Sequence, residues 1–186
     1  MKSVLSRSIK DLQALLPRME PLAPQLGRLG DALLDCWKKN GKVLIAGNGG
    51  SAADAMHLAE ELCVRFAKNR RALAAMALCD PTVLTCAAND FGFESIFSRQ
   101  IEALGNSQDV FIALTTSGNS ANLVRAVEAA KARRLLTVAF LGKDGGQLRG
   151  KCDIELLIPS PTTARIQECQ KLLYHCLCEW IESKIE

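Results

Sequence analysis

The stretch Lys42-Val43-Leu44-Ile45-Ala46-Gly47-Asn48-Gly49-Gly50-Ser51 joins a short apolar run to a glycine-rich turn, and a helical pattern follows it over 51–66. A continuous apolar run bounded by turn residues is typical of a strand buried on both faces. Glycines let the backbone turn tightly and approach a ligand where the helix begins. The stretch therefore predicts the first strand, turn and helix of a parallel sheet covered on both faces.

The same alternation continues to the end of the chain. The expected strands are 42–46, 73–78, 110–114, 136–141 and 154–158, and the expected helices are 51–66, 80–88, 94–104, 120–133 and 162–184. We therefore predict an α/β fold, a three-layer sandwich in which helices flank a five-stranded parallel sheet of the flavodoxin or Rossmann kind. Ligands of such sheets bind at the carboxyl ends of the strands.

Residues 1–40 read as a helical extension that precedes the sheet. Apolar residues recur at helical spacing from Val4 to Leu16 and from Leu26 to Trp37, with three prolines between the two segments. We expect one domain over residues 1–186, within which the apolar stripe of this extension packs against the domain or against another copy of the chain. The extension is thus a candidate for oligomerisation.

Composition limits the possible partners. The chain has 186 residues, is 48% apolar and carries a formal charge of +3, with no basic run that favours nucleic acid. No segment reads as a signal peptide or a membrane span. The eight cysteines include no Cys-x-x-Cys pair, so free thiols in a reducing cytoplasm are the simplest interpretation.

Both histidines of the chain fall in patterns that indicate chemistry. His57 and Glu61 are four residues apart, so on a helix they share one face and can hold an ion or share a proton. His175 follows Gln167 by eight residues. The alternative for the His57–Glu61 pair is an ordinary surface ion pair.

The loop after the third strand, Thr115-Thr116-Ser117-Gly118-Asn119-Ser120, offers four hydroxyls at a helix start. An ordinary N-cap needs only one hydroxyl, so we favour a site for a phosphate monoester held by hydroxyls and backbone amides. Asn89 and Asp90 precede Gly92 and suit either a simple turn or contacts with sugar hydroxyls.

Six blocks, in order, resemble the phosphoheptose isomerases, a family of sugar isomerase (SIS) domain enzymes. The blocks are Gly47-Asn48-Gly49-Gly50-Ser51-Ala52-Ala53-Asp54-Ala55, Asn89-Asp90-Phe91-Gly92-Phe93, Phe97-Ser98-Arg99-Gln100, Thr116-Ser117-Gly118-Asn119-Ser120-Ala121-Asn122, Gly142-Lys143-Asp144-Gly145-Gly146 and Ala164-Arg165-Ile166-Gln167-Glu168. The resemblance implies conversion of sedoheptulose 7-phosphate to D-glycero-D-manno-heptose 7-phosphate, the first step of ADP-heptose and surface-polysaccharide heptose biosynthesis. It also implies a cytoplasmic homotetramer with sites at subunit interfaces.

The resemblance assigns roles to single residues. It implies one divalent metal ion per subunit, zinc, held by His57, Glu61, Gln167 and His175. It places phosphate contacts at Ser51, Thr115, Thr116, Ser117 and Ser120, and sugar contacts at Asn48, Gly49, Gly50, Asn89 and Asp90. Glu61 and Gln167 would also touch the phosphorylated seven-carbon sugar, and Arg65 would face the site.

The chain departs from the family pattern at two positions. Thr115 stands where Ser is usual, and Gln170 stands where the Arg-Ile-Gln-Glu block is usually followed by His. The change at Gln170 bears on substrate identity. Two other functions also stay open: an adaptor like the non-enzymatic replication-initiator-associating protein of the same fold, which lacks a full ligand set, and a phosphosugar-sensing module.

Isomerisation of an aldose to a ketose moves a proton between C1 and C2 through an enediol and needs a base and an acid. We expect Glu61 to be the base and His175 the acid, each alternating between this task and metal binding. On one helix Gln167 and His175 would lie about 12 Å apart along the axis. Two ligands of one ion are closer together than that, which favours a site shared between subunits.

Overall fold

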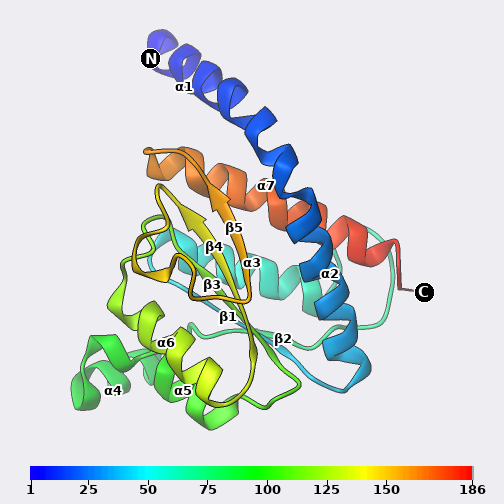
Figure 1. Cartoon of the computed structure of the whole chain (residues 1–186), viewed down its shortest axis with the longest axis vertical. Coiled ribbons are helices and arrows are strands. Elements are labelled where there is room, and N and C mark those ends of the chain that lie inside the picture. The colour runs from blue at the N-terminus through cyan, green and yellow to red at the C-terminus, as the bar shows by residue number, and fades with distance from the viewer. Residues whose placement is uncertain (186) are drawn as a thin grey trace.

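The computed structural model describes residues 1–185, which leaves Glu186 outside the described residues. Over that range β1 (Val43–Gly47), β2 (Ala75–Ala77), β3 (Val110–Leu114), β4 (Leu136–Gly142) and β5 (Ile154–Ile158) form one parallel sheet. The strand order is β2-β1-β3-β4-β5, the flavodoxin-like order (Figure 1). The predicted five-stranded α/β fold is confirmed.

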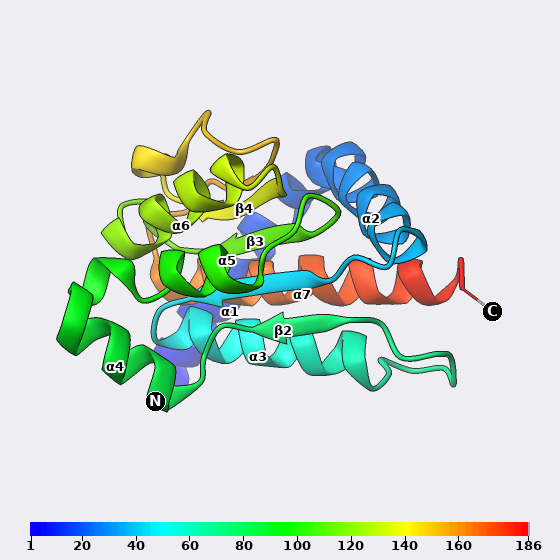
Figure 2. The same cartoon turned by 90° about the horizontal axis from the view of Figure 1, so that it is seen from below.

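Helices cover both faces of this sheet (Figures 1 and 2). Successive strand side chains point to opposite faces, so Val43 and Ile45 join one apolar core and Leu44 and Ala46 join the other. The first core is completed by α2 (Ala23–Lys38), α3 (Gly50–Cys63) and α7 (Thr163–Glu182). The second is completed by α4 (Pro81–Phe91), α5 (Ser98–Leu104), α6 (Ala121–Ala132) and the short η3 (Gly146–Leu148).

The amino-terminal extension is helical, as predicted. It consists of α1 (Lys2–Leu15), the 3₁₀ segment η1 (Leu16–Leu22), which contains two of the three prolines, and α2. α2 packs on the sheet core, whereas α1 projects away from the body of the molecule (Figure 1). Val4, Leu5 and Ile9 of α1 are 49%, 59% and 47% exposed. Among the helices of residues 1–185, none combines the length and the hydropathy needed to cross a bilayer.

The helices predicted over 51–66 and 80–88 end instead at Cys63 and Phe91, and two other predicted elements differ more. The helix expected over 94–104 is interrupted, with the 3₁₀ turn η2 (Phe93–Ser95) separated from α5 by Ile96 and Phe97. Both of these side chains are buried in the second core, so the apolar pattern runs on across a break in the helix. The strand expected over 73–78 shortens to β2, because at this edge of the sheet only three residues pair with β1.

The strand order reverses between β1 and β3, which places the loops that follow these two strands side by side. The first loop leads into α3 and the second into α6. On the other side of α3 lies α7, which contacts it directly. These loops and the α3–α7 contact hold most of the predicted site residues.

Candidate active site

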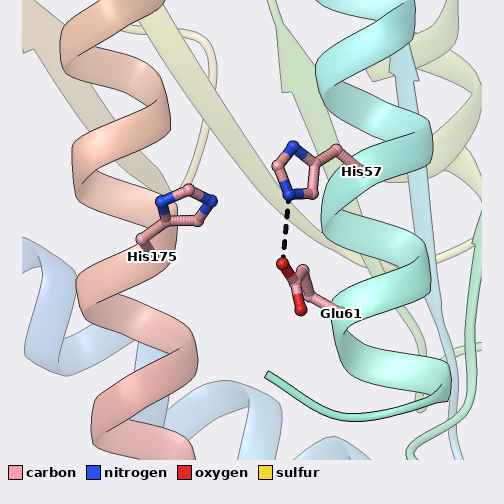
Figure 3. Close-up of side chains that lie close together, drawn as sticks. All are labelled: His57, Glu61 and His175. Carbon is pink, nitrogen blue, oxygen red and sulfur yellow. Dashed lines mark hydrogen bonds and ion pairs between the residues drawn. The ribbon is translucent and has the colours of Figure 1, made fainter. Parts of the chain in front are cut away.

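α3 and α7 bring His57, Glu61 and His175 together (Figure 3). His57 Nε2 lies 3.0 Å from Glu61 Oε1, and the rings of His57 and His175 are 5.1 Å apart between centroids. One ligand atom from each of the three residues falls within 4.8 Å of the others. A helix of the first half of the chain and the last helix thus combine two imidazoles and a carboxylate, a donor set that suits zinc.

His175 has a donor atom left over for such an ion. Its Nε2 is buried and has no hydrogen-bond partner among the described residues. Burial, followed by the nearby charges of His57 and Lys171, lowers the pKa of His175 below its ordinary value. A neutral imidazole with an unused buried nitrogen fits a metal ligand.

Three further side chains surround His57, and sequence reasoning gave them no role. Tyr174 Oη lies 3.2 Å from His57 Nδ1 and donates a 3.2 Å hydrogen bond to Asp54 Oδ1. Lys171 Nζ lies 3.4 Å from His57 Nδ1 and 3.3 Å from Asp54 Oδ1. Burial and the Asp54 charge raise the pKa of Tyr174, so its hydroxyl keeps its proton. Asp54 could have been found, since it precedes His57 by three residues on one helix face.

Gln167 lies elsewhere on α7. A Cβ at Gly50 would approach Gln167 Nε2 to 2.5 Å, so the Gln167 amide rests on the first turn of α3. Gly50 precedes His57 by seven residues, roughly 10 Å along a helix axis. Within one chain, therefore, the structure gathers His57, Glu61 and His175 and places Gln167 about two turns away. Glu61 and His175 therefore meet without a neighbouring subunit, and only Gln167 of the four predicted ligands is separated from the group.

The loop after β1 is shaped by its glycines and by one side-chain pair. Gly49 has φ of 55°, which favours glycine, and a Cβ at Gly47 would come within 2.5 Å of a backbone oxygen. Asn48 and Asn122 exchange two hydrogen bonds of 2.9 Å. Because Asn122 lies at the start of α6, this pair ties the two predicted substrate loops together. Ser51 is buried.

The loop after β3 uses its hydroxyls unequally. Thr115 is buried, and its Oγ1 accepts hydrogen bonds from the backbone N–H groups of Ser117 and Gly118 at 3.4 and 3.1 Å. Ser120 is the N-cap of α6, yet it makes no side-chain capping bond within the described chain. Thr116, Ser117 and Ser120 are half-buried. The Thr115 hydroxyl thus shapes the loop, and the Ser120 hydroxyl is not occupied by capping.

A hollow of about 410 Å³ lies beside these two loops. Its lining includes Phe93 and Glu94, which sequence reasoning missed, together with the predicted Asn48 and Ser120, and with Ala121 and Asn122. Two larger hollows lie away from the predicted residues. One, of about 540 Å³, opens at the amino ends of β3, β4 and β5, and the other, of about 530 Å³, opens between α4 and α5.

Asn89 and Asp90 occupy the exposed last turn of α4, before Gly92 with φ of 86°. Their side chains bond to each other at 2.7 Å, and Asp90 also accepts a bond from Cys86. Arg65 lies beyond the end of α3 and donates to Asn69. The structure does not bring these three predicted residues into contact with the histidine group.

Gln170, one of the two departures from the family pattern, is fully buried. Its Nε2 donates to the backbone oxygens of Thr115 and Phe140, both at 3.1 Å. Gln170 therefore links the carboxyl ends of β3 and β4 by hydrogen bonds, and it is not among the residues that line the 410 Å³ hollow.

Comparison with known proteins gives consistent matches. Residues 9–142 match the family described as "SIS domain". The chain is 51% identical over 155 residues to the phosphoheptose isomerase of Fusobacterium nucleatum, covering 83% of this chain and 80% of that protein. It is 45% identical over 183 residues to phosphoheptose isomerase 1 of Campylobacter jejuni, covering 98% of each. The solved phosphoheptose isomerase from Neisseria gonorrhoeae superposes with a TM-score of 0.92 at 38% identity, covering 98% of each chain.

Proposed function

The chain belongs to the phosphoheptose isomerases of the SIS domain family, and from that membership we propose that it isomerises sedoheptulose 7-phosphate with the residues gathered between α3 and α7. The product is D-glycero-D-manno-heptose 7-phosphate. The observation that carries the proposal is the meeting of His57, Glu61 and His175, which brings a carboxylate and two imidazoles within 4.8 Å of one another.

The chemistry needs a base at the sugar carbon and an acid at the neighbouring oxygen. Glu61 acts as the base that removes a proton from C1 of the ketose and returns it to C2 of the enediol. His175 acts as the acid at the neighbouring sugar oxygen, because its buried Nε2 has no hydrogen-bond partner among the described residues. His57 Nε2 lies 3.0 Å from Glu61 Oε1, so the two side chains could share one ion.

His57, Glu61 and His175 would also hold one divalent metal ion, zinc, in each subunit. Two imidazoles and a carboxylate are a common catalytic zinc set that leaves a position open. When bound, the ion supplies Lewis-acid polarisation of the sugar carbonyl. Glu61 and His175 would thus be both ligands of the ion and the groups placed to move the substrate proton.

The two loops at the β1–β3 switch point bind the rest of the substrate. Thr116, Ser117 and Ser120, with the amides at the start of α6, hold the phosphate, while Thr115 and Ser51 support the loops from within. Asn48, Gly49 and Gly50 contact the sugar. The carboxyl edge of the sheet and the half-buried hydroxyls there support this assignment.

We further propose that residues 1–186 form one SIS domain and that residues 1–40 hold it in a homotetramer. The exposed apolar residues of α1 support an interface there. Gln167, Asn89 and Asp90 lie away from the histidine group of their own chain, and Gln167 rests instead on Gly50 of the substrate loop. These residues and loops would meet a histidine group at a site completed by a neighbouring subunit. We place the enzyme in the cytoplasm, with which the eight free cysteines agree. We also propose that it serves surface-heptose biosynthesis, including that of lipopolysaccharide.

The direct test is conversion. Purified protein supplied with zinc and sedoheptulose 7-phosphate should yield the aldose phosphate, followed by NMR, and the Glu61→Gln variant should serve as the matched blank. Absence of conversion, together with tight binding of a replication initiator, would favour the adaptor function instead.

A further inference from the structure

The side of His57 that faces away from Glu61 is enclosed by Asp54 and Tyr174. Tyr174 is fully buried, and Asp54 is 6% exposed. The Tyr174 hydroxyl stands 3.2 Å from His57 Nδ1 and 3.2 Å from Asp54 Oδ1. A single hydroxyl therefore connects the imidazole to a buried carboxylate.

The donors and acceptors of His57, Tyr174 and Asp54 fix the direction of the hydrogen bonds that join them. If the metal ion proposed above sits among His57, Glu61 and His175, it takes the lone pair of His57 Nε2, and the ring proton must be on Nδ1. Tyr174 Oη can then accept a hydrogen bond from Nδ1–H while its own O–H donates a hydrogen bond to Asp54 Oδ1. We propose that Tyr174 and Asp54 are positioning residues that hold His57 in its metal-binding tautomer and orientation. This inference rests on the proposed metal site.

Lys171 acts in the opposite sense. An ammonium group has donors and no acceptor, so its 3.4 Å contact with His57 Nδ1 is a hydrogen bond only while that nitrogen keeps its lone pair. That state has the proton on Nε2, where it faces Glu61 and blocks metal binding. With Nδ1 protonated, Lys171 keeps only its 3.3 Å ion pair with Asp54. Tyr174 and Lys171 thus favour opposite tautomers of one imidazole.

The test measures zinc affinity by competition with a chromophoric chelator. Tyr174→Phe removes only the hydroxyl and should raise the zinc dissociation constant about 10–100-fold, the usual effect of losing such an outer partner. Lys171→Met should lower the dissociation constant. Cobalt(II) absorption of each variant would report the ligand geometry independently of turnover.

Thr137→Val is the matched control, because Thr137 is also a buried hydroxyl that donates to a carboxylate, Asp153, at 2.6 Å. It should lower the melting temperature and leave zinc affinity unchanged, which separates a general packing loss from an effect on His57. An unchanged dissociation constant in folded Tyr174→Phe would overturn the inference while leaving the proposed metal site intact. Failure of the unsubstituted protein to bind zinc would overturn both.

Discussion

Glu61 is half-buried on α3 and is within hydrogen-bonding distance of His57, with His175 across the gap from α7. Replacing it with glutamine keeps the shape of the side chain and removes the proposed base. Glu61→Gln should therefore fold normally by circular dichroism yet lose on the order of 10²–10⁴ in turnover. His175→Asn should behave similarly.

Glu60→Gln is the control for this experiment. Glu60 is the adjacent carboxylate, its side chain is 57% exposed, and it lies 3.9 Å from His57. It should keep near-normal turnover. Normal turnover in Glu61→Gln itself would remove Glu61 from the mechanism.

The hydroxyls of Ser117 and Ser120 give a second prediction, for substrate recognition. Each hydrogen bond to a charged phosphate is worth roughly 1.5–3 kcal/mol, so replacing both residues with alanine should raise KM for the phosphorylated sugar more than it lowers kcat. Ser107→Ala, before β3 at the opposite end of the sheet, should leave KM unchanged. An unaltered KM in the double variant would mean that the loop only begins a helix.

At this scale the sequence predicted part of the site. His57 and Glu61 share a helix face through their spacing, which local geometry alone can indicate. The approach of His175 depends on how α7 packs on α3, and it was reached through the family resemblance. Tyr174 was missed because neighbouring residues on a helix point in different directions, so its contact with His57 is visible only in three dimensions.

The segment that follows α3 is held by Glu182 near the end of α7. The Glu182 carboxylate accepts hydrogen bonds from the backbone N–H groups of Phe66, Ala67 and Lys68 at 2.8, 3.0 and 2.8 Å, and it pairs with Arg70 at 3.4 Å. Burial by itself would raise the pKa of Glu182, but these donors outweigh it and lower the pKa below its ordinary value.

Glu182→Gln should therefore destabilise the protein, by roughly 3–5 kcal/mol because Arg70 is left without its buried partner. A carboxyl with a lowered folded-state pKa stabilises the fold above its unfolded pKa, about 4.3–4.5, and this stabilisation is lost as the pH falls through the folded value. Urea unfolding should show the full difference from the unsubstituted protein at pH 7 and a smaller difference near pH 4.

Glu179→Gln, on an exposed turn of the same helix, should change the unfolding free energy little at either pH. A difference between Glu182→Gln and the unsubstituted protein that does not vary with pH would show that the lost contribution is packing and not the charge of the carboxylate.

The elements themselves were largely predictable. β3 and β5 have the predicted bounds, because a continuous apolar run flanked by turn residues marks where a strand begins and ends. The break between η2 and α5 was not predictable, since Ile96 and Phe97 keep the apolar pattern while the backbone leaves the helix. Register and strand order depend on contacts between distant segments, which periodicity does not report.

For the whole molecule, the separation of Gln167 from the histidine group predicts an assembly in which sites are shared. Mixing Glu61→Gln and Gln167→Ala subunits after dissociation should restore activity at up to roughly a quarter of sites, as expected if a symmetric oligomer joins the two residues across an interface. Mixing Glu61→Gln with His175→Asn should restore none, because both residues lie in one chain's cluster.

Light scattering before and after mixing would report the oligomeric state. Replacing Leu5 and Ile9 with lysine, on the exposed face of α1, should reduce the size of the assembly. A monodisperse monomer with full activity would contradict the shared site.

The contact between α3 and α7 also restricts how the chain can change in length. Gln167 meets Gly50, and eight residues later His175 meets His57, which is seven residues after Gly50. The two helices therefore run in the same direction and match each other over about two turns. A single inserted residue within either interval would rotate everything beyond it by about 100°, turning one imidazole away while the other contact stayed. Insertions and deletions should accordingly be confined to the loops outside these two intervals.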